Sequence, residues 1–248
     1  MKKLKLIGPL KQIVTMTGLP LKGPLSDEQL IVLEDAGILL EGDKIKSVSK
    51  FDELKAEFKE AELHELKGDH TCLPGFIDAH THICFGGSRA NDYAMRNAGK
   101  TYLEIAKAGG GIWDTVTQTR KASKAELTKN TKKRATRHLR NGVTTLEVKS
   151  GYGLSVKEEL KMLYAIKEAN EAIPADLITT CLAAHMVPKD YKGSAETYLE
   201  EISTELFPIL KTENLTHRID AFIEESAFSA SQIAPYFEKA KQMGFDIT

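Results

Sequence analysis

Leu73-Pro74-Gly75-Phe76-Ile77-Asp78-Ala79-His80-Thr81-His82 is the stretch that decides how the rest of this sequence is interpreted. Its apolar residues Phe76 and Ile77 predict a short buried strand. Residues two apart in a strand point to the same face, so His80 and His82 project into one space. Two converging neutral imidazoles suit a metal ion. A solvated or hydrogen-bonded structural pair is the alternative, but unliganded imidazoles are hard to satisfy in a buried strand.

The composition describes an ordinary globular protein. Of the 248 residues, 42% are hydrophobic and 28% are charged, and the net charge of −1 gives no sign of a nucleic-acid partner. No apolar run approaches the ~20 residues that cross a bilayer, and the N-terminus lacks the apolar core of a signal peptide. Cys72, Cys84 and Cys181 lack the spacing of a zinc site and suit a reducing cytoplasm. We therefore expect a cytoplasmic protein that acts on a small molecule, without nucleic-acid or membrane partners.

The pattern along the chain divides it into two domains. Residues 1–70 contain several short strands separated by polar turns, which predicts a small β-rich domain. Over residues 71–248 strands alternate with helices, which indicates βα units and a parallel sheet. Four predicted strands end in polar or ionisable residues, namely His80 and His82, Lys149 to Tyr152, His185, and Glu224 with Glu225.

Such strand ends converge on one face of a (β/α)8 barrel, where active sites lie. The sequence contains four complete strands and the start of a fifth. We therefore expect an α/β fold, an incomplete (β/α)8 TIM-like barrel, preceded by the small β-rich domain.

Further motifs make the pattern specific. They are Phe85-Gly86-Gly87-Ser88-Arg89, Gly109-Gly110-Gly111-Ile112, Glu147-Val148-Lys149-Ser150-Gly151-Tyr152-Gly153-Leu154 and Ala183-Ala184-His185. The stretch 73–82 resembles the first barrel strand of the metal-dependent amidohydrolase superfamily. With the other motifs, residues 4–248 resemble the imidazolonepropionase family. This resemblance implies hydrolysis of the cyclic amide of 4-imidazolone-5-propanoate to N-formimino-L-glutamate, a step of histidine degradation, with one zinc or iron ion.

The resemblance also implies roles for individual residues. His80 and His82 match metal ligands. The positions that match substrate-binding residues are Arg89, Tyr102, Tyr152 and His185. An arginine forks onto a carboxylate such as the propanoate, and His185 is the catalytic candidate because an imidazole titrating near ~6.5 can orient or protonate a substrate. The alternatives are a surface arginine, a strand-capping tyrosine and a structural histidine.

Other residues receive weaker interpretations. We interpret Lys149 as a structural or outer group of the site, and Glu224 and Glu225 as support for it without an assigned role. The Gly109–Gly111 run lacks the pattern of a phosphate-binding loop.

The family pattern contains two ligands that these 248 residues lack, a third histidine on strand five and an aspartate on strand eight. Catalytic zinc sites use three protein ligands, so we expect the fragment alone to be unstable and inactive. Imidazole and carboxylate ligands do not choose zinc over iron, and relatives commonly form homodimers. The alternative functions are another cyclic amidohydrolase or deaminase, and an inactive remnant that acts as a binding or scaffold protein.

Overall fold

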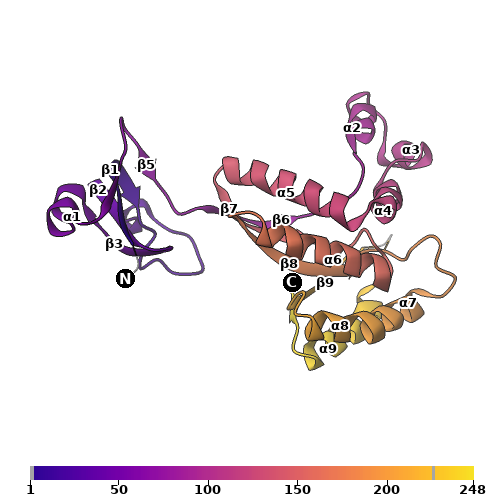
Figure 1. The fold of residues 1–248 in the computed structure, drawn as a ribbon. Helices are drawn as coiled ribbons and strands as arrows, with labels where there is room; N and C mark the ends of the chain where they lie inside the picture. Colours follow the sequence, from indigo (N-terminus) through magenta and orange to yellow (C-terminus); the bar gives the residue numbers. More distant parts are fainter. Residues whose placement is uncertain (1–2, 225–226) are drawn as a thin grey trace. The chain divides into compact units, whose positions relative to one another are not determined.

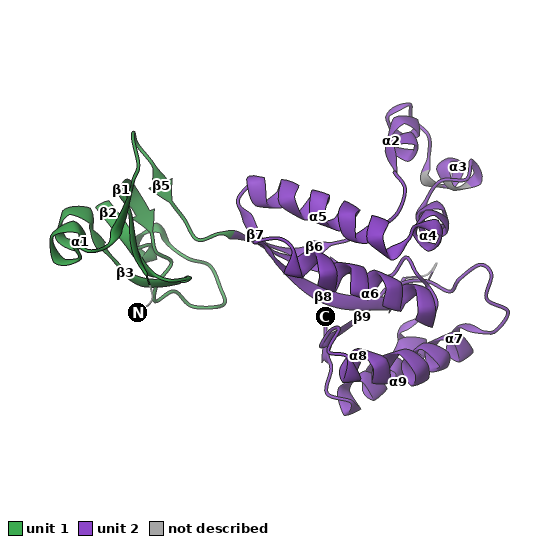
Figure 2. Cartoon of the chain, viewed as in Figure 1, with its two compact units in different colours: residues 1–75 green, residues 76–248 purple. Residues whose placement is uncertain are grey.

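The computed structural model describes residues 3–224 and 227–248, without the side chains of Tyr102 and Ala106. The chain forms two compact units, Met1–Gly75 and Phe76–Thr248 (Figure 2). Within the described residues, no helix combines the length and the apolar character needed to span a membrane.

The first unit is a five-stranded sheet with one α-helix. Its elements are β1 (Leu4–Val14), the short 3-10 helix η1 (Asp27–Gln29), β2 (Val32–Glu41), β3 (Lys44–Lys50), α1 (Phe51–Glu57), β4 (Glu62–Glu65) and β5 (Thr71–Cys72). The strand order is β3-β2-β1-β4, and β5 also pairs with β1. The helix α1 packs Phe51 and Leu54 against Leu6 and Leu39 in a small buried cluster.

The second unit is a five-stranded sheet in the order β10-β9-β8-β7-β6, with every neighbouring pair parallel. Its strands are β6 (Phe76–Thr81), β7 (Val143–Lys149), β8 (Asp176–Ala184), β9 (Arg218–Ala221) and β10 (Asp246–Ile247). Its helices are α2 (Ala90–Asn97), α3 (Tyr102–Lys107), α4 (Ile112–Lys121), α5 (Lys124–Arg140), α6 (Val156–Glu171), α7 (Ala195–Glu201), the π-helical stretch η2 (Ile202–Leu206), α8 (Phe207–Thr212) and α9 (Ala230–Gln242) (Figure 1). The sequence prediction of alternating βα units with a parallel sheet is confirmed.

Side-chain alternation gives this sheet one apolar face and one polar face. Leu146 and Val148 of β7 are fully buried in a cluster with Met162 and Ile166 of α6, and α5 lies beside α6 (Figure 1). The helices α7 to α9 form a second cluster with β8 and β9. Because successive strand residues point to opposite faces, the residues between these apolar positions face away from the helices. That second face carries the candidate site.

The prediction that the histidine strand is buried is wrong. Phe76 and Ile77 of β6 are 58% and 71% exposed. Among the described residues β6 lies at the edge of the sheet and pairs with β7 alone. Ile77 lines an open concavity of about 1020 Å³ on the face opposite the helices. An apolar side chain is buried only where another element covers it, and no described element of the second unit covers this face.

Candidate active site

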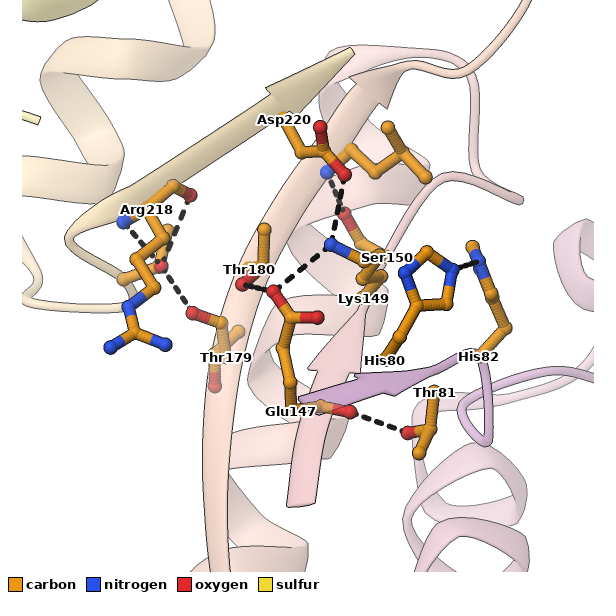
Figure 3. Close-up of polar contacts among 12 residues, drawn as sticks. His80, Thr81, His82, Glu147, Lys149, Ser150, Thr179, Thr180, Arg218 and Asp220 are labelled. Atoms are coloured by element: carbon orange, nitrogen blue, oxygen red, sulfur yellow. Dashed lines mark hydrogen bonds and ion pairs between the residues drawn. The ribbon is translucent and has the colours of Figure 1, made fainter. Parts of the chain in front are cut away.

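His80 of β6 and His82, the first residue after this strand, converge at its C-terminal end. The Nε2 atoms of His80 and His82 lie 3.3 Å apart, and the two rings meet edge to face. Thr81, between them, points to the opposite side and donates its hydroxyl to the carbonyl oxygen of Glu147 at 2.5 Å. This bond anchors the edge strand to β7 at the position where the imidazoles project (Figure 3).

The surroundings of His82 favour its neutral form. Burial lowers the pKa of His82 to about 4, and positive charge at His185, His80 and Lys149 acts in the same direction. The buried Nδ1 atom of His82 has no hydrogen-bond partner among the described residues. A neutral imidazole is the form that binds a metal ion.

The histidine pair fits two positions around one ion. Two imidazole nitrogens on one tetrahedral ion at roughly 2.0–2.1 Å lie about 3.3 Å apart, and the two Nε2 atoms are separated by 3.3 Å. The described residues contain no group of three or more His, Cys, Asp or Glu side chains placed to hold an ion. The pair therefore offers part of a donor set.

Tyr152 and His185 complete an aromatic cluster with His82. The ring of His185 stacks at 5.5 Å from the ring of His82 and lies 5.5 Å from that of Tyr152, and Tyr152 lies 5.8 Å from His82. The Nδ1 atom of His185 is 2.9 Å from the carbonyl oxygen of Gly151. A carbonyl only accepts, so Nδ1 carries the hydrogen and Nε2 is left as an acceptor. Burial lowers the pKa of His185, although the Gly151 carbonyl opposes this shift.

Glu159 holds the loop that carries Tyr152. Its fully buried carboxylate accepts the backbone N–H groups of Gly151, Gly153 and Leu154 at 3.0, 2.7 and 2.8 Å. Sequence reasoning missed this residue. The available signal was a glutamate on the apolar side of α6, in the first turn of this helix.

Arg89 is fixed at the start of α2. Its Nε donates to Asp92 Oδ2 at 2.5 Å, and its Nη1 donates to Thr115 Oγ1 at 3.0 Å. Burial raises the pKa of Tyr152, and the positive charge of Arg89 opposes this shift. Tyr102 begins α3, and its side chain lies outside the described residues.

A buried ion network lies on the same face as His80. Lys149 Nζ donates to Glu147 Oε1 at 2.9 Å and to Asp220 Oδ2 at 2.8 Å, and Thr180 donates to the same Glu147 oxygen at 2.7 Å (Figure 3). The network spans β7, β8 and β9. Sequence reasoning named Lys149 but missed Asp220.

The expectation for the end of the fourth strand needs correction. Glu224 is exposed, and Glu225 lies outside the described residues. The acidic group that β9 contributes to the inner face is instead Asp220, because residues 218 and 220 share that face by strand alternation.

Comparison with solved structures defines the class of fold. E. coli guanine deaminase is 16% identical with a TM-score of 0.59, and the match covers 99% of this chain and 52% of that chain. A. niger ochratoxinase is 13% identical with a TM-score of 0.56, covering 99% and 55%. No protein-family model matches the chain. The fold is thus one that this chain shares with these two enzymes.

Comparison with curated protein sequences gives a more specific result than the comparison of folds. Imidazolonepropionase of Acinetobacter baumannii is 41% identical over 223 residues, or 90% of this chain and 55% of that protein. Imidazolonepropionase of Pseudomonas aeruginosa is 43% identical over 216 residues, covering 87% and 53%. The chain spans about half the length of the curated relatives it matches. The resemblance to imidazolonepropionases is confirmed, and the coverage is consistent with an N-terminal portion of such a chain.

Proposed function

We propose that this chain is part of a metal-dependent hydrolase that opens the cyclic amide of 4-imidazolone-5-propanoate to give N-formimino-L-glutamate, a reaction of histidine degradation. The observation that carries the proposal is the convergence of His80 and His82 with Tyr152 and His185 at the C-terminal ends of β6, β7 and β8. The 40–43% identity to proteins named imidazolonepropionase supports this reaction over others.

In this proposal the chain's own residues bind and orient the substrate. Arg89 receives the propanoate carboxylate, because a guanidinium pairs with two carboxylate oxygens at once. Tyr152 and His185 lie against His82 and bind the ring, with the free Nε2 of His185 as a hydrogen-bond acceptor. Tyr102 is proposed as a further substrate contact.

His80 and His82 would hold one zinc or iron ion. A bound ion of this kind supplies Lewis acidity and lowers the pKa of water toward about 7. Two imidazole nitrogens at a 3.3 Å separation suit that role. Two histidines are fewer than the three protein ligands of catalytic zinc sites, so further ligands would come from a histidine and an aspartate outside these 248 residues.

We further infer that the five-stranded sheet is the first part of a (β/α)8 barrel whose remaining strands cover the concave face. The exposure of Ile77 on an edge strand supports this inference, as does the match to about half of each solved neighbour. We expect the 248-residue chain alone to bind metal weakly and to be inactive. The three unpaired cysteines agree with a cytoplasmic enzyme, and a homodimer is its proposed assembly.

The test is a hydrolysis assay of the full-length gene product with imidazolone propanoate and either Zn²⁺ or Fe²⁺. We expect turnover with one bound ion per chain, and loss of both in His82→Asn. The matched control is His64→Asn, an exposed histidine of β4 in the first unit, which should keep both. Turnover of guanine or dihydroorotate instead would favour another amidohydrolase, and folded protein without any turnover would favour a binding or scaffold role.

A further inference from the structure

Asp92 of α2 links the start of this helix to the turn before α4, a contact that the proposed function does not explain. Its Oδ2 atom accepts Arg89 Nε at 2.5 Å and the backbone N–H of Gly111 at 2.9 Å. The Asp92 side chain is 14% exposed. One carboxylate therefore ties the arginine at the start of α2 to the glycine that precedes α4.

The glycine run 109–111 is shaped around this carboxylate. A Cβ atom on Gly110 would overlap Asp92 Oδ1 and lie 2.9 Å from Asp92 Cγ. Gly111 has a φ of +84°, a backbone conformation that favours glycine, at the N-cap of α4. The run is thus a turn that allows the backbone to approach Asp92. This contact accounts for the three glycines, which lack the pattern of a phosphate-binding loop.

The helix α4 holds the other side of Arg89. Thr115, a buried residue of α4, accepts Arg89 Nη1 at 3.0 Å. A Cβ atom on Gly86 would lie 2.6 Å from the backbone oxygen of Gln118, so the loop that leads to Arg89 rests directly on α4. Asp92 and Thr115 therefore fix the guanidinium from two directions.

The remaining donors of Arg89 are free for a ligand. A guanidinium has five N–H donors, and the Nη2 amine of Arg89 has no partner among the described residues. Arg89 lines a cavity of about 610 Å³ together with Asp92, Tyr93, Arg96, Lys100, Thr101 and Ile105. Arg89, Arg96 and Lys100 line this cavity with Asp92, and Glu104 pairs with Lys100 beside it, so one positive charge remains in excess for a small anion.

We propose that Asp92 is the positioning residue of Arg89, and that the Gly109–Gly111 turn exists to lock Asp92 in place so that the terminal amines of Arg89 face a substrate carboxylate. This inference rests on the proposed function for the identity of the carboxylate. The alternative is that Asp92 only braces α2 against α4, with no consequence for ligand recognition.

The first arm of the test observes the arginine directly and needs no turnover. In the ¹⁵N-labelled full-length gene product, the Nε–H signal of Arg89, assigned by its loss in Arg89→Lys, should exchange slowly with water and shift on addition of propanoate. Asp92→Ala and Gly110→Ala should abolish the slow exchange. Gly110 does not adopt a positive φ, so its variant tests the contact with Asp92. Asp114→Ala, which removes an acid from α4, is the matched control and should keep the signal.

The second arm measures kinetics in the full-length gene product. Losing a charge-assisted hydrogen bond of the arginine should raise KM for imidazolone propanoate about tenfold in Asp92→Ala, with little change in kcat. In an Arg89→Met background the same substitution should add nothing, because Asp92 acts through Arg89.

The outcomes separate the two proposals. An unchanged Arg89 signal in Asp92→Ala overturns the inference whatever the activity, and so do independent, multiplying effects of the two substitutions on KM. Absence of wild-type turnover overturns the proposed function but leaves the signal of Arg89 to decide the role of Asp92.

Discussion

Replacing Lys149 by methionine tests whether the ion network of Glu147, Lys149 and Asp220 stabilises the second unit against unfolding. The side chains of Lys149 and Glu147 are 3% and 6% exposed, and that of Asp220 is 16% exposed. Methionine keeps the length of the side chain but removes the ammonium, which donates to both carboxylates. The variant would leave two largely buried carboxylates without their shared counter-charge.

The size of the effect follows from this burial. Breaking a buried ion pair from one side costs about 3–5 kcal/mol. Water reaches part of Asp220, so we expect the lower end of that range, about 3 kcal/mol. At roughly 2–4 °C per kcal/mol for a unit of this size, Tm should fall by about 6–12 °C.

Urea unfolding followed by tryptophan fluorescence measures this loss in the second unit. Trp113 is the single tryptophan of the chain and lies in α4. The matched control is Lys124→Met, since Lys124 pairs with Glu168 on the surface with side chains 48% and 41% exposed. Such a pair contributes less than about 1 kcal/mol. Equal midpoints for the two variants would refute the reasoning, and a Glu147→Gln, Lys149→Met, Asp220→Asn triple variant should recover stability because no unpaired charge remains.

A histidine, a glutamate and the thiols provide three more tests. Because the pKa of His82 is lowered to about 4 from an unfolded value near ~6.5, the unfolded chain binds more protons between these values. Urea midpoints should therefore be highest above pH ~6.5 and fall as the pH falls toward 4, less steeply in His82→Asn. Glu159→Gln should lower the unfolding free energy by about 2–4 kcal/mol, measured in urea, because a neutral amide replaces a carboxylate that accepts three N–H groups. A thiol reagent should modify Cys72 in the native chain, whereas Cys84 and Cys181, fully buried with pKa values raised to about 12, should react only in urea; three fast thiols would contradict this.

Strand periodicity and local motifs indicated several of the residues that the structure brings together, while their roles stay a prediction. The alternation of strand side chains is a property of the strand itself, so the convergence of His80 and His82 followed from their spacing. The glycines around Tyr152 indicated a tight loop, and that loop brings the Tyr152 ring against His82. The βα alternation likewise indicated a parallel sheet before any contact was known.

The partners of these residues were beyond sequence reasoning because they depend on long-range contacts. Lys149 and Asp220 are 71 positions apart, and Arg89 and Thr115 are 26 apart. A carboxylate has no periodic signal that tells which loop or cation it will hold.

The sequence by itself therefore determined the order of strands and helices, the face on which the histidines project and the family to which the chain is similar. The tertiary structure alone decided that Glu159 holds the Tyr152 loop, that Asp92 holds Arg89 and that Phe76 and Ile77 are exposed. The physical reason is that side-chain direction is set within a single strand or helix, whereas burial and hydrogen-bond partners depend on which other elements come to lie against it.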